Sequence, residues 1–504
     1  MKKYFVVIGA VILVMALAAP SMAQFKSWGH MEIQTIWEQK PDFNTGRGGF
    51  NQGVAASSPA EQKRDLTWKH IAERFRFYLQ YGDPKTVRAV IGFEADSQEW
   101  GELRGSGTTT GGRMGAYTVD SVQLEIKHAY LDFVFPNTPV SIMAGLQAFE
   151  FGGRLFMNCD APGVKIIGNF APHTITAFWW RENDGIQLTS GTQSSPVARS
   201  TYAVNDTYGL EYKLTQKLFN IAAFGAYKND LWTLQGGNGS VDINFDEHPW
   251  WIGASAGFRP GNFDLFAQFI YNGGKFKYTG PTLPGFDDID LEAYALEASA
   301  KYRIGPGMFV GLEGFYSTGN DADKADKYKL YQVPTNSESQ SIFGNDRTVF
   351  FWMNAAQMGY YHQANLAFMG MWYGRANFEF SPTSWIRFNL NYLYIGDNTK
   401  GTPGVYTDGP LAGRQKVVNS PGTYANSSDP RTINSAATQN VDKDKVGQEV
   451  NLITSINIYQ GFVYHIGLAV FFPGDVYDVY NTAGNKVRSA DTAYAINSKL
   501  VYAF

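Results

Sequence analysis

The sequence predicts an all-β fold, a transmembrane antiparallel β-barrel of about 18 strands with short periplasmic turns and long extracellular loops. Three observations lead to this fold class: the composition, a period-two alternation of side chains, and the alternating lengths of the connections. Only 17% of the 504 residues are charged and 15% are aromatic, whereas soluble domains usually contain roughly 25% charged residues. This composition favours strands with one apolar and one polar face over a dry core inside a charged shell.

The first 23 residues are typical of a secretory signal peptide. Lys2 and Lys3 precede an apolar run over residues 4–19, and residues 21–23 (Ser-Met-Ala) form a small-x-small cleavage site. The run is shorter than the roughly 20 residues that a helical membrane span requires, and no apolar run of that length follows it. We therefore expect residues 24–504 to form one exported barrel domain.

Period-two alternation recurs along the rest of the chain. In residues 208–214, Tyr208 and Leu210 share one face, and Glu211 and Lys213 share the other. The same pattern predicts strands at residues 25–38, 67–82, 86–98, 121–135, 138–149, 161–168, 173–182, 205–215, 218–230, 249–259, 262–273, 290–304, 308–318, 365–380, 384–396, 446–458, 462–472 and 493–503. Loss of the short strand at 161–168 together with a neighbour would give 16 strands, the alternative even number.

The connections alternate between tight turns and long polar loops. Glycine, proline, asparagine and aspartate supply the turn chemistry in segments 82–84, 136–139, 260–262, 305–307 and 381–383. Long loops are expected at 41–66, 98–120, 183–204, 319–363 and 397–445. Outer-membrane barrels have this asymmetry, and the last strand ends on the aromatic Phe504, which resembles the insertion signal of Gram-negative outer-membrane proteins. We therefore predict a location in the cell outer membrane with both termini in the periplasm.

Charged residues repeat on the faces opposite the apolar ones. A dry core would not hold so many charges, because each unpaired buried charge costs several kcal/mol. A barrel of 16–18 strands leaves an aqueous lumen, which removes this difficulty. The candidate pore-lining residues are Arg74, Arg76, Arg88, Glu94, Arg375, Glu379, Arg387 and Glu449. The same projection also places Lys213, Lys301, Arg303, Lys499, Asp96, Glu211, Asp264, Glu297 and Glu313 inside.

Three of these arginines allow two interpretations. Arg74, Arg76 and Arg88 lie on strands joined by a tight turn, so they form a basic patch if they act together. Because the strands are antiparallel, Glu94 should instead lie opposite Arg74 or Arg76 and pair with it. We expect at most a mild anion preference, and a triple alanine variant of the arginines with unchanged ion selectivity would identify them as structural partners.

A break in alternation predicts a β-bulge near Lys127. Glu125 and Lys127 share one face, whereas His128, Tyr130 and Asp132 share the other. One extra residue in the strand reconciles the two phases.

No motif indicates catalysis or a cofactor. HExxH, Walker A and CxxCH patterns are absent, and the single Cys159 forms no intrachain disulfide. Two groups of aspartates, at 321, 323 and 326 and at 287, 288 and 290, lack the spacing of a known Ca²⁺ loop, so solvated acids are favoured. We expect neither an enzyme nor a cofactor, and the formal net charge of -4 argues against nucleic acid.

Three stretches carry a family resemblance. Residues 128–133 (HAYLDF), 144–147 (AGLQ) and 151–155 (FGGRL), with 447–452 and 471–475 near the end, resemble alginate-export-type outer-membrane porins. The resemblance implies an eighteen-stranded, apparently monomeric barrel whose glycine-rich segment enters the lumen. Where that family typically has Gly-Arg-Gln, this sequence has Leu146 in place of the arginine, which argues against a strongly anionic polymer as the solute.

These observations predict an outer-membrane porin that lets small hydrophilic solutes diffuse passively through a water-filled, charge-lined lumen. The expected partners are outer-membrane lipid and the solutes, and the sequence leaves monomer and trimer open. Two alternatives remain at this stage: a structural sheath around a periplasmic electron carrier, and a barrel enzyme whose catalytic residues meet only in the fold.

Overall fold

The computed structural model describes twelve stretches of the chain. They are residues 25–40, 67–100, 124–184, 204–234, 243–278, 289–319, 327–334, 347–349, 370–398, 444–475, 478–480 and 486–504. The predicted signal peptide and the aspartates at 287, 288, 321, 323 and 326 lie outside these residues.

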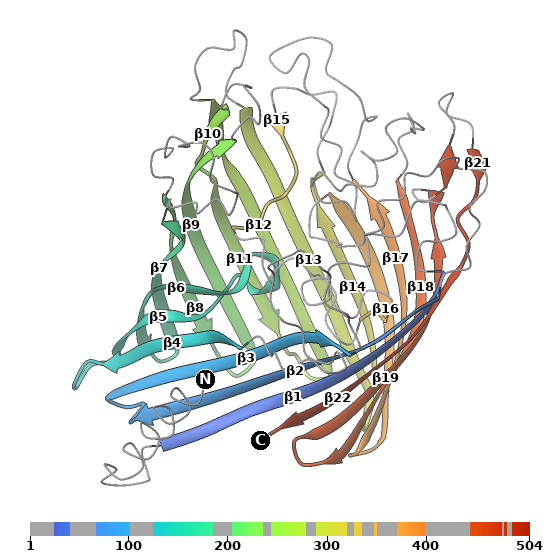
Figure 1. Cartoon of the computed structure of the whole chain (residues 1–504), viewed down its shortest axis with the longest axis horizontal. Helices are drawn as coiled ribbons and strands as arrows, with labels where there is room; N and C mark the ends of the chain where they lie inside the picture. The colour runs from blue at the N-terminus through green and yellow to red at the C-terminus, as the bar shows by residue number, and fades with distance from the viewer. Residues whose placement is uncertain are drawn as a thin grey trace, which may run out of the picture.

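The described residues form a closed antiparallel barrel (Figure 1). Each wall strand pairs with its neighbour along the chain, and closure comes from pairing of the first with the last. The eighteen wall strands are β1 (Phe25–Gln39), β2 (Thr67–Gly82), β3 (Val87–Glu99), β4 (Glu125–Val134), β5 (Val140–Phe151), β6 (Met157–Phe170), β7 (His173–Asp184), β8 (Val204–Thr215), β9 (Phe219–Leu234), β11 (Trp250–Phe258), β12 (Phe263–Tyr278), β13 (Ile289–Gly305), β14 (Met308–Ser317), β16 (Met371–Thr383), β17 (Ile386–Asp397), β18 (Lys445–Tyr459), β19 (Phe462–Pro473) and β22 (Ala493–Ala503). The predicted strand count is therefore confirmed.

Four short strands lie outside this count. β10 (Ile243–Glu247) pairs with β9 and β12 and continues the line of β11, and β15 (Lys327–Tyr328) pairs in parallel with β13. β20 (Val479–Tyr480) and β21 (Lys486–Arg488) form a separate two-stranded sheet.

The observed bounds match the period-two prediction closely. The segment predicted at 161–168, the shortest of the set, is the 14-residue strand β6. Tight turns join the strands at one end of the barrel, where Gly307 (φ +67) and Gly461 (φ +74) adopt a backbone conformation that residues with a side chain rarely reach. The chain carries glycine there because the turn geometry requires it.

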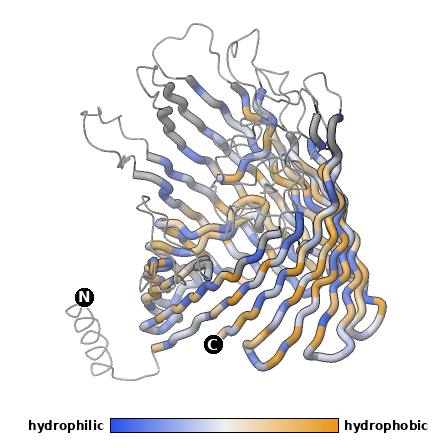
Figure 2. Tube along the Cα trace, turned by 45° about the vertical axis from the view of Figure 1, so that its right-hand side comes forward, coloured by the Kyte–Doolittle hydropathy of each residue, from blue (hydrophilic) through white to orange (hydrophobic). Residues whose placement is uncertain are grey.

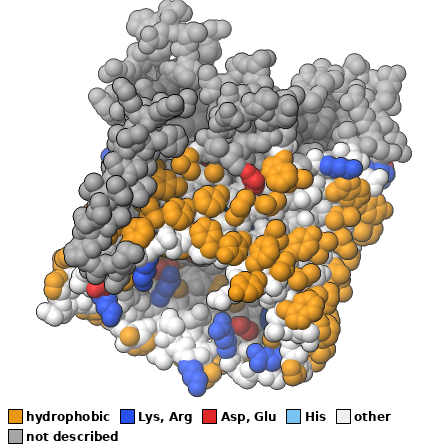
Figure 3. All heavy atoms as spheres, turned by 60° about the horizontal axis from the view of Figure 1, so that its bottom comes forward, with side chains coloured by type: hydrophobic (Ala, Val, Ile, Leu, Met, Phe, Trp, Pro, Cys, Tyr) orange, Lys and Arg blue, Asp and Glu red, His pale blue; other side chains and the backbone are white. Residues whose placement is uncertain are grey.

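The outer surface of the wall is apolar. Leu210, Ile252 and Leu312 are 53%, 54% and 67% exposed, and they alternate along their strands with inward side chains. Figure 2 shows this alternation as colours that switch along each strand, and Figure 3 shows apolar side chains covering the visible flank of the barrel. A surface with apolar side chains outside and polar side chains inside reverses the arrangement of a soluble protein, and it requires a lipid environment around the wall.

None of the described residues forms a helix that is long and apolar enough to cross a membrane.

The two ends of the described chain meet in the wall. β1 lies between β2 and β22, and the marked C-terminus lies near the start of β1 (Figure 1). Gly29 and Phe504 exchange two backbone hydrogen bonds of 3.0 Å, and the Phe504 ring stacks near Phe75 and Phe77. These contacts complete the closure at the C-terminal residue.

The predicted bulge in β4 is present. The pairing of β3 with β4 passes from Gly92 opposite His128 to Phe93 opposite Ile126, which leaves Lys127 as the extra residue. Lys127 and His128 consequently both reach the same carboxylate, that of Asp160.

Candidate functional site

A hairpin made from the ends of β5 and β6 leaves the wall and crosses the lumen. Pairing of β4 with β5 ends at Leu146, and pairing of β6 with β7 begins at Gly163, so residues 147–162 pair only with each other. Gly145 has φ +130 at the point of departure. The amide of Gln147 donates to the Met143 and Gly163 carbonyls at 3.1 Å, which fixes the bend.

One face of this hairpin packs on aromatic side chains of the wall strands that follow β6, namely β7, β9 and β11. Phe151 stacks on Phe178 of β7 with ring centroids 4.0 Å apart, and Phe156 contacts Phe224 of β9 and Trp251 of β11 at 4.5 and 5.6 Å. The tip is further held by a hydrogen bond from Gln268 of β12 to the Gly152 carbonyl. This side of the lumen is therefore filled by apolar packing.

A segment of the loop between β14 and β16 rests on the same tip. The Tyr331 hydroxyl donates to the Leu155 carbonyl at 2.6 Å, and Trp251 and Asn272 bond to the backbone of Gln332. Burial raises the pKa of the Tyr331 hydroxyl above its ordinary value, so the group stays a neutral donor. Segment 327–334 thus fastens the hairpin tip to the wall.

The other face of the hairpin lies against a cluster of charged side chains. This cluster, called the Glu94 cluster, consists of Arg74, Arg76, Glu94, Lys127 and Asp160. Glu94 is 2% exposed and lies 3.0, 2.7 and 2.7 Å from nitrogens of Arg74, Arg76 and Lys127. Lys127 also lies 2.7 Å from Asp160 of the hairpin. Three cations thus surround two carboxylates, which link β2, β3 and β4 to the hairpin.

The expected pairing of Glu94 with Arg74 or Arg76 is therefore present. Arg88, the third arginine of the predicted strip, pairs instead with Asp132 of β4 at 2.9 Å and donates to Gln80 at 3.3 Å. The side chain of Asp96 lies outside the described residues. The arginines consequently do not form an unpaired basic patch.

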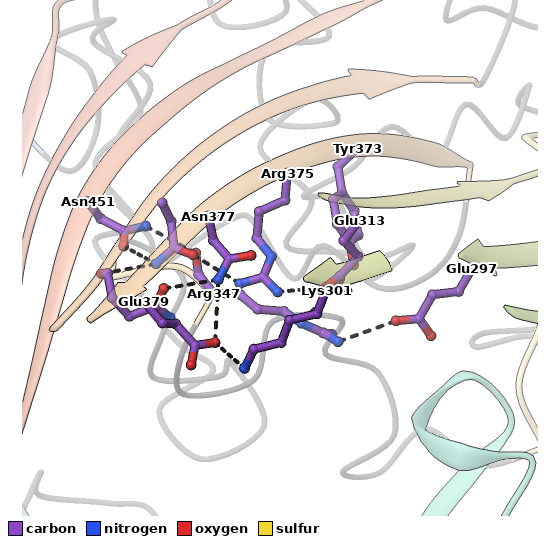
Figure 4. A network of polar contacts seen from close by, with 11 residues as sticks. Glu297, Lys301, Glu313, Arg347, Tyr373, Arg375, Asn377, Glu379 and Asn451 are labelled. Atoms are coloured by element: carbon purple, nitrogen blue, oxygen red, sulfur yellow. Dashed lines mark hydrogen bonds and ion pairs between the residues drawn. The ribbon is translucent and has the colours of Figure 1, made fainter. Parts of the chain in front are cut away.

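A second polar network, the Glu313 network, lies on the inner faces of β13, β14 and β16 (Figure 4). Arg375 donates to Glu313 at 2.7 Å, and the Tyr373 hydroxyl donates to the same carboxylate. Arg347, from the loop between β14 and β16, lies 3.1 Å from Glu313 and 3.3 Å from Glu297. The loop therefore supplies a cation that two wall carboxylates hold.

The residues after Arg347 are fastened to the next strands. Glu449 of β18 accepts from the Val349 amide at 2.7 Å and from the Thr348 hydroxyl, and Asn497 of β22 donates to the Val349 carbonyl at 2.7 Å. The Val349 side chain fills the space that a side chain on Gly467 of β19 would occupy. Segment 347–349 is thus docked on the inner wall through both side chains and backbone.

The remaining candidate residues occupy the same inner face. Glu379 accepts from Lys301 at 2.7 Å, and Arg387 is exposed near the tight turn that precedes β17. Asn391 and Asn451 connect Arg375 to Glu449 through hydrogen bonds of 3.0, 2.9 and 2.8 Å. Arg375 and Glu449 therefore belong to one continuous network, whereas Arg387 lies apart from it.

Sequence reasoning missed the interior residues that come from loops and from the hairpin. Arg347, Thr348 and Tyr331 lie in a segment expected to be an extracellular loop, and Asp160 lies in the connection between the predicted strands at 138–149 and 161–168. Alternation reports only the two faces of a strand, so it carries no signal for a loop that turns inward.

No metal centre is evident in the part of the chain that the structure describes. Within those residues, histidine, cysteine, aspartate and glutamate side chains do not gather in groups of three or more that could hold an ion. Asp290 of the predicted acidic groups lies 3.4 Å from Lys275.

An eighteen-strand closed antiparallel barrel with an apolar outer surface and an ion-paired interior belongs to one class of protein, the outer-membrane β-barrels. No family model matches the chain, and no curated protein matches it. The resemblance to alginate-export porins therefore stays a prediction.

Three solved structures illustrate what the fold is similar to. OccK9 (OpdG) of Pseudomonas aeruginosa shares 11% identity at a TM-score of 0.49, over 95% of this chain and 98% of that chain. A BenF-like porin from Pseudomonas fluorescens Pf-5 shares 9% identity at a TM-score of 0.48, and the match covers 95% of this chain and 98% of that chain. OccAB1 of Acinetobacter baumannii shares 12% identity at a TM-score of 0.48, and the match covers 95% of this chain and 97% of that chain.

Proposed function

We propose that the protein is a porin through which small hydrophilic solutes diffuse passively. The observation that carries this proposal is the interior: two ion-paired networks line the wall on either side of a lumen that the hairpin and the docked loop narrow. Charged side chains are retained at this density only where water reaches them, because dry burial costs several kcal/mol for each unpaired charge.

The same interior argues against a sheath around an electron carrier. Residues 147–162 run inside the barrel from β4 to β12, so a folded carrier would meet them. A small solute needs only the space beside the hairpin, where Asp160 and the Glu94 cluster supply donors and acceptors.

Reconstitution into planar lipid bilayers tests the proposal. We expect stepwise, ohmic conductance with weak ion selectivity, because most inner charges have a partner of opposite sign. Heat-denatured protein from the same preparation is the control. Intact folded barrels that give no conductance steps would contradict the porin assignment.

Docking of segment 347–349 can be tested with an engineered disulfide. A Cβ at position 467 would lie 3.4 Å from the Val349 Cβ, close to the roughly 3.5–4.5 Å that a disulfide spans. We expect Val349→Cys with Gly467→Cys, in a Cys159→Ala background, to form the bond on oxidation. The locked channel should keep its conductance and show less current noise, because the loop already occupies that position.

The two single-cysteine variants are the controls for this test, and reduction should restore the noise. Failure of the pair to crosslink in folded protein would show that the loop does not rest on β19. A large fall in conductance on crosslinking would show that the docked position closes the channel.

A further inference from the structure

Four aromatic rings form a continuous surface on the inner wall, here called the aromatic platform: Trp28, Tyr78, His128 and Tyr130. Trp28 stacks on Tyr78 with centroids 5.4 Å apart and planes inclined by 8°. The ring centroids of Tyr78 and His128 lie 5.5 Å apart, and those of His128 and Tyr130 lie 6.1 Å apart. A Cβ at Gly92 of β3 would come within 2.5 Å of the Tyr78 ring, so this ring lies across the wall, over the glycine.

The platform faces the lumen near the tight turns. Trp28 pairs in register with Tyr78, and Tyr78 follows Arg76 at a spacing of two, so all three share the inner face. Arg88, opposite Gly82 at the β2–β3 turn, marks the periplasmic end. Trp28 is 37% exposed, so part of its indole remains accessible to a solute.

The polar atoms of these rings are available to a solute. Among the described residues, the Trp28 indole N–H and the hydroxyls of Tyr78 and Tyr130 have no hydrogen-bond partner in the protein. Tyrosine and tryptophan usually find a partner when they are buried. Apolar ring faces beside free polar atoms suit a ligand that is itself apolar on one face and polar at its edge.

The neighbouring charges select the chemistry of that ligand. Arg88 pairs with Asp132 at 2.9 Å, and the Arg88 side chain is 27% exposed, so this end of the platform carries a charge-balanced pair with an accessible guanidinium. Asp132 follows Tyr130 at a spacing of two and is 8% exposed. A charge-balanced pair favours neither an anion nor a cation, whereas a neutral hydroxyl can accept from Arg88 and donate to the Tyr130 hydroxyl.

We propose that the aromatic platform is a binding subsite for neutral carbohydrate rings at the periplasmic end of the lumen. The apolar face of a pyranose stacks on the exposed Trp28 indole beside Tyr78, and its hydroxyls bond to the Tyr130 hydroxyl and the Arg88 guanidinium. This inference rests on the proposed porin function and gives it a solute class.

Block of single-channel current by maltose tests the subsite. We expect maltose in the millimolar range to interrupt the current of the wild type, and sorbitol, which has hydroxyls but no ring, to do so much less. Trp28→Ala and Tyr78→Ala should each raise the half-blocking concentration of maltose by roughly three- to tenfold, because each variant loses one ring contact.

Trp250→Ala is the matched control, because Trp250 is 38% exposed on the outer face and should leave the block unchanged. Conductance without maltose block would overturn the subsite and leave the porin assignment intact. Benzoate block that is equally sensitive to Trp28→Ala would assign the platform to aromatic acids and overturn the carbohydrate proposal.

A wild type that does not conduct would end the porin proposal. Saturation-transfer NMR of maltose with the folded protein in detergent would then decide the subsite separately: transfer lost in Trp28→Ala supports it, and no transfer to the wild type overturns it.

Discussion

Replacing Glu94 by glutamine should destabilise the barrel and shift its ion selectivity toward anions. Glu94 is 2% exposed and is the shared counter-ion of Arg74, Arg76 and Lys127. Its removal takes away the carboxylate that these three cations share and leaves Asp160 as the remaining carboxylate of the Glu94 cluster. We expect a loss on the order of 3 kcal/mol, the low end for removing one partner of a buried ion pair, because lumen water reaches Arg76.

The temperature at which the folded band is lost in detergent gels measures the stability, and reversal potentials in a salt gradient measure the selectivity. Glu150→Gln is the matched control, because this substitution removes the same charge from an exposed position on the hairpin. We expect it to leave the transition temperature unchanged. If Glu94→Gln behaved like Glu150→Gln, solvent would be screening the Glu94 cluster and the ion pairs would contribute little.

Replacing Gly145 by alanine should prevent the hairpin from adopting its position across the lumen. Gly145 has φ +130, and a Cβ there would lie 2.8 Å from the Tyr130 Cα and closer still to the Ala129 carbonyl. The backbone would have to move, which we expect to cost about 3 kcal/mol. Conductance should rise, because a displaced hairpin no longer fills the lumen beside β7–β12.

Gly374→Ala provides the comparison, because a Cβ on Gly374 meets no atom within 4 Å. That variant should match the wild type in both transition temperature and conductance. An unchanged conductance for a folded Gly145→Ala protein would show that the hairpin does not limit the flow of ions.

The two interpretations of the arginine strip are now distinguishable by geometry. Arg74 and Arg76 share Glu94, and Arg88 is bonded to Asp132, which supports structural pairing over an anion filter. Cross-strand spacing alone indicated the partner of Arg76, because Glu94 lies directly opposite it in the register. It did not indicate Asp132, because a long connection joins β3 and β4 and leaves open which residue of β4 lies opposite Arg88.

The sequence by itself determined the barrel. Strand positions, the inner face of each strand and the bulge at Lys127 follow from local alternation, because in a membrane barrel every second side chain meets lipid and the rest meet water. The turn positions follow equally from local chemistry, as at Gly307.

Only the tertiary structure decided what fills the lumen. The contacts of Tyr331 with Leu155, of Val349 with Gly467 and of Asp160 with Lys127 join segments that local periodicity treats as independent. Gly145 bends a strand whose sequence alternates like its neighbours, and Arg347 enters from a polar loop. Such contacts depend on which surfaces meet after the barrel has closed, so no spacing along the chain encodes them.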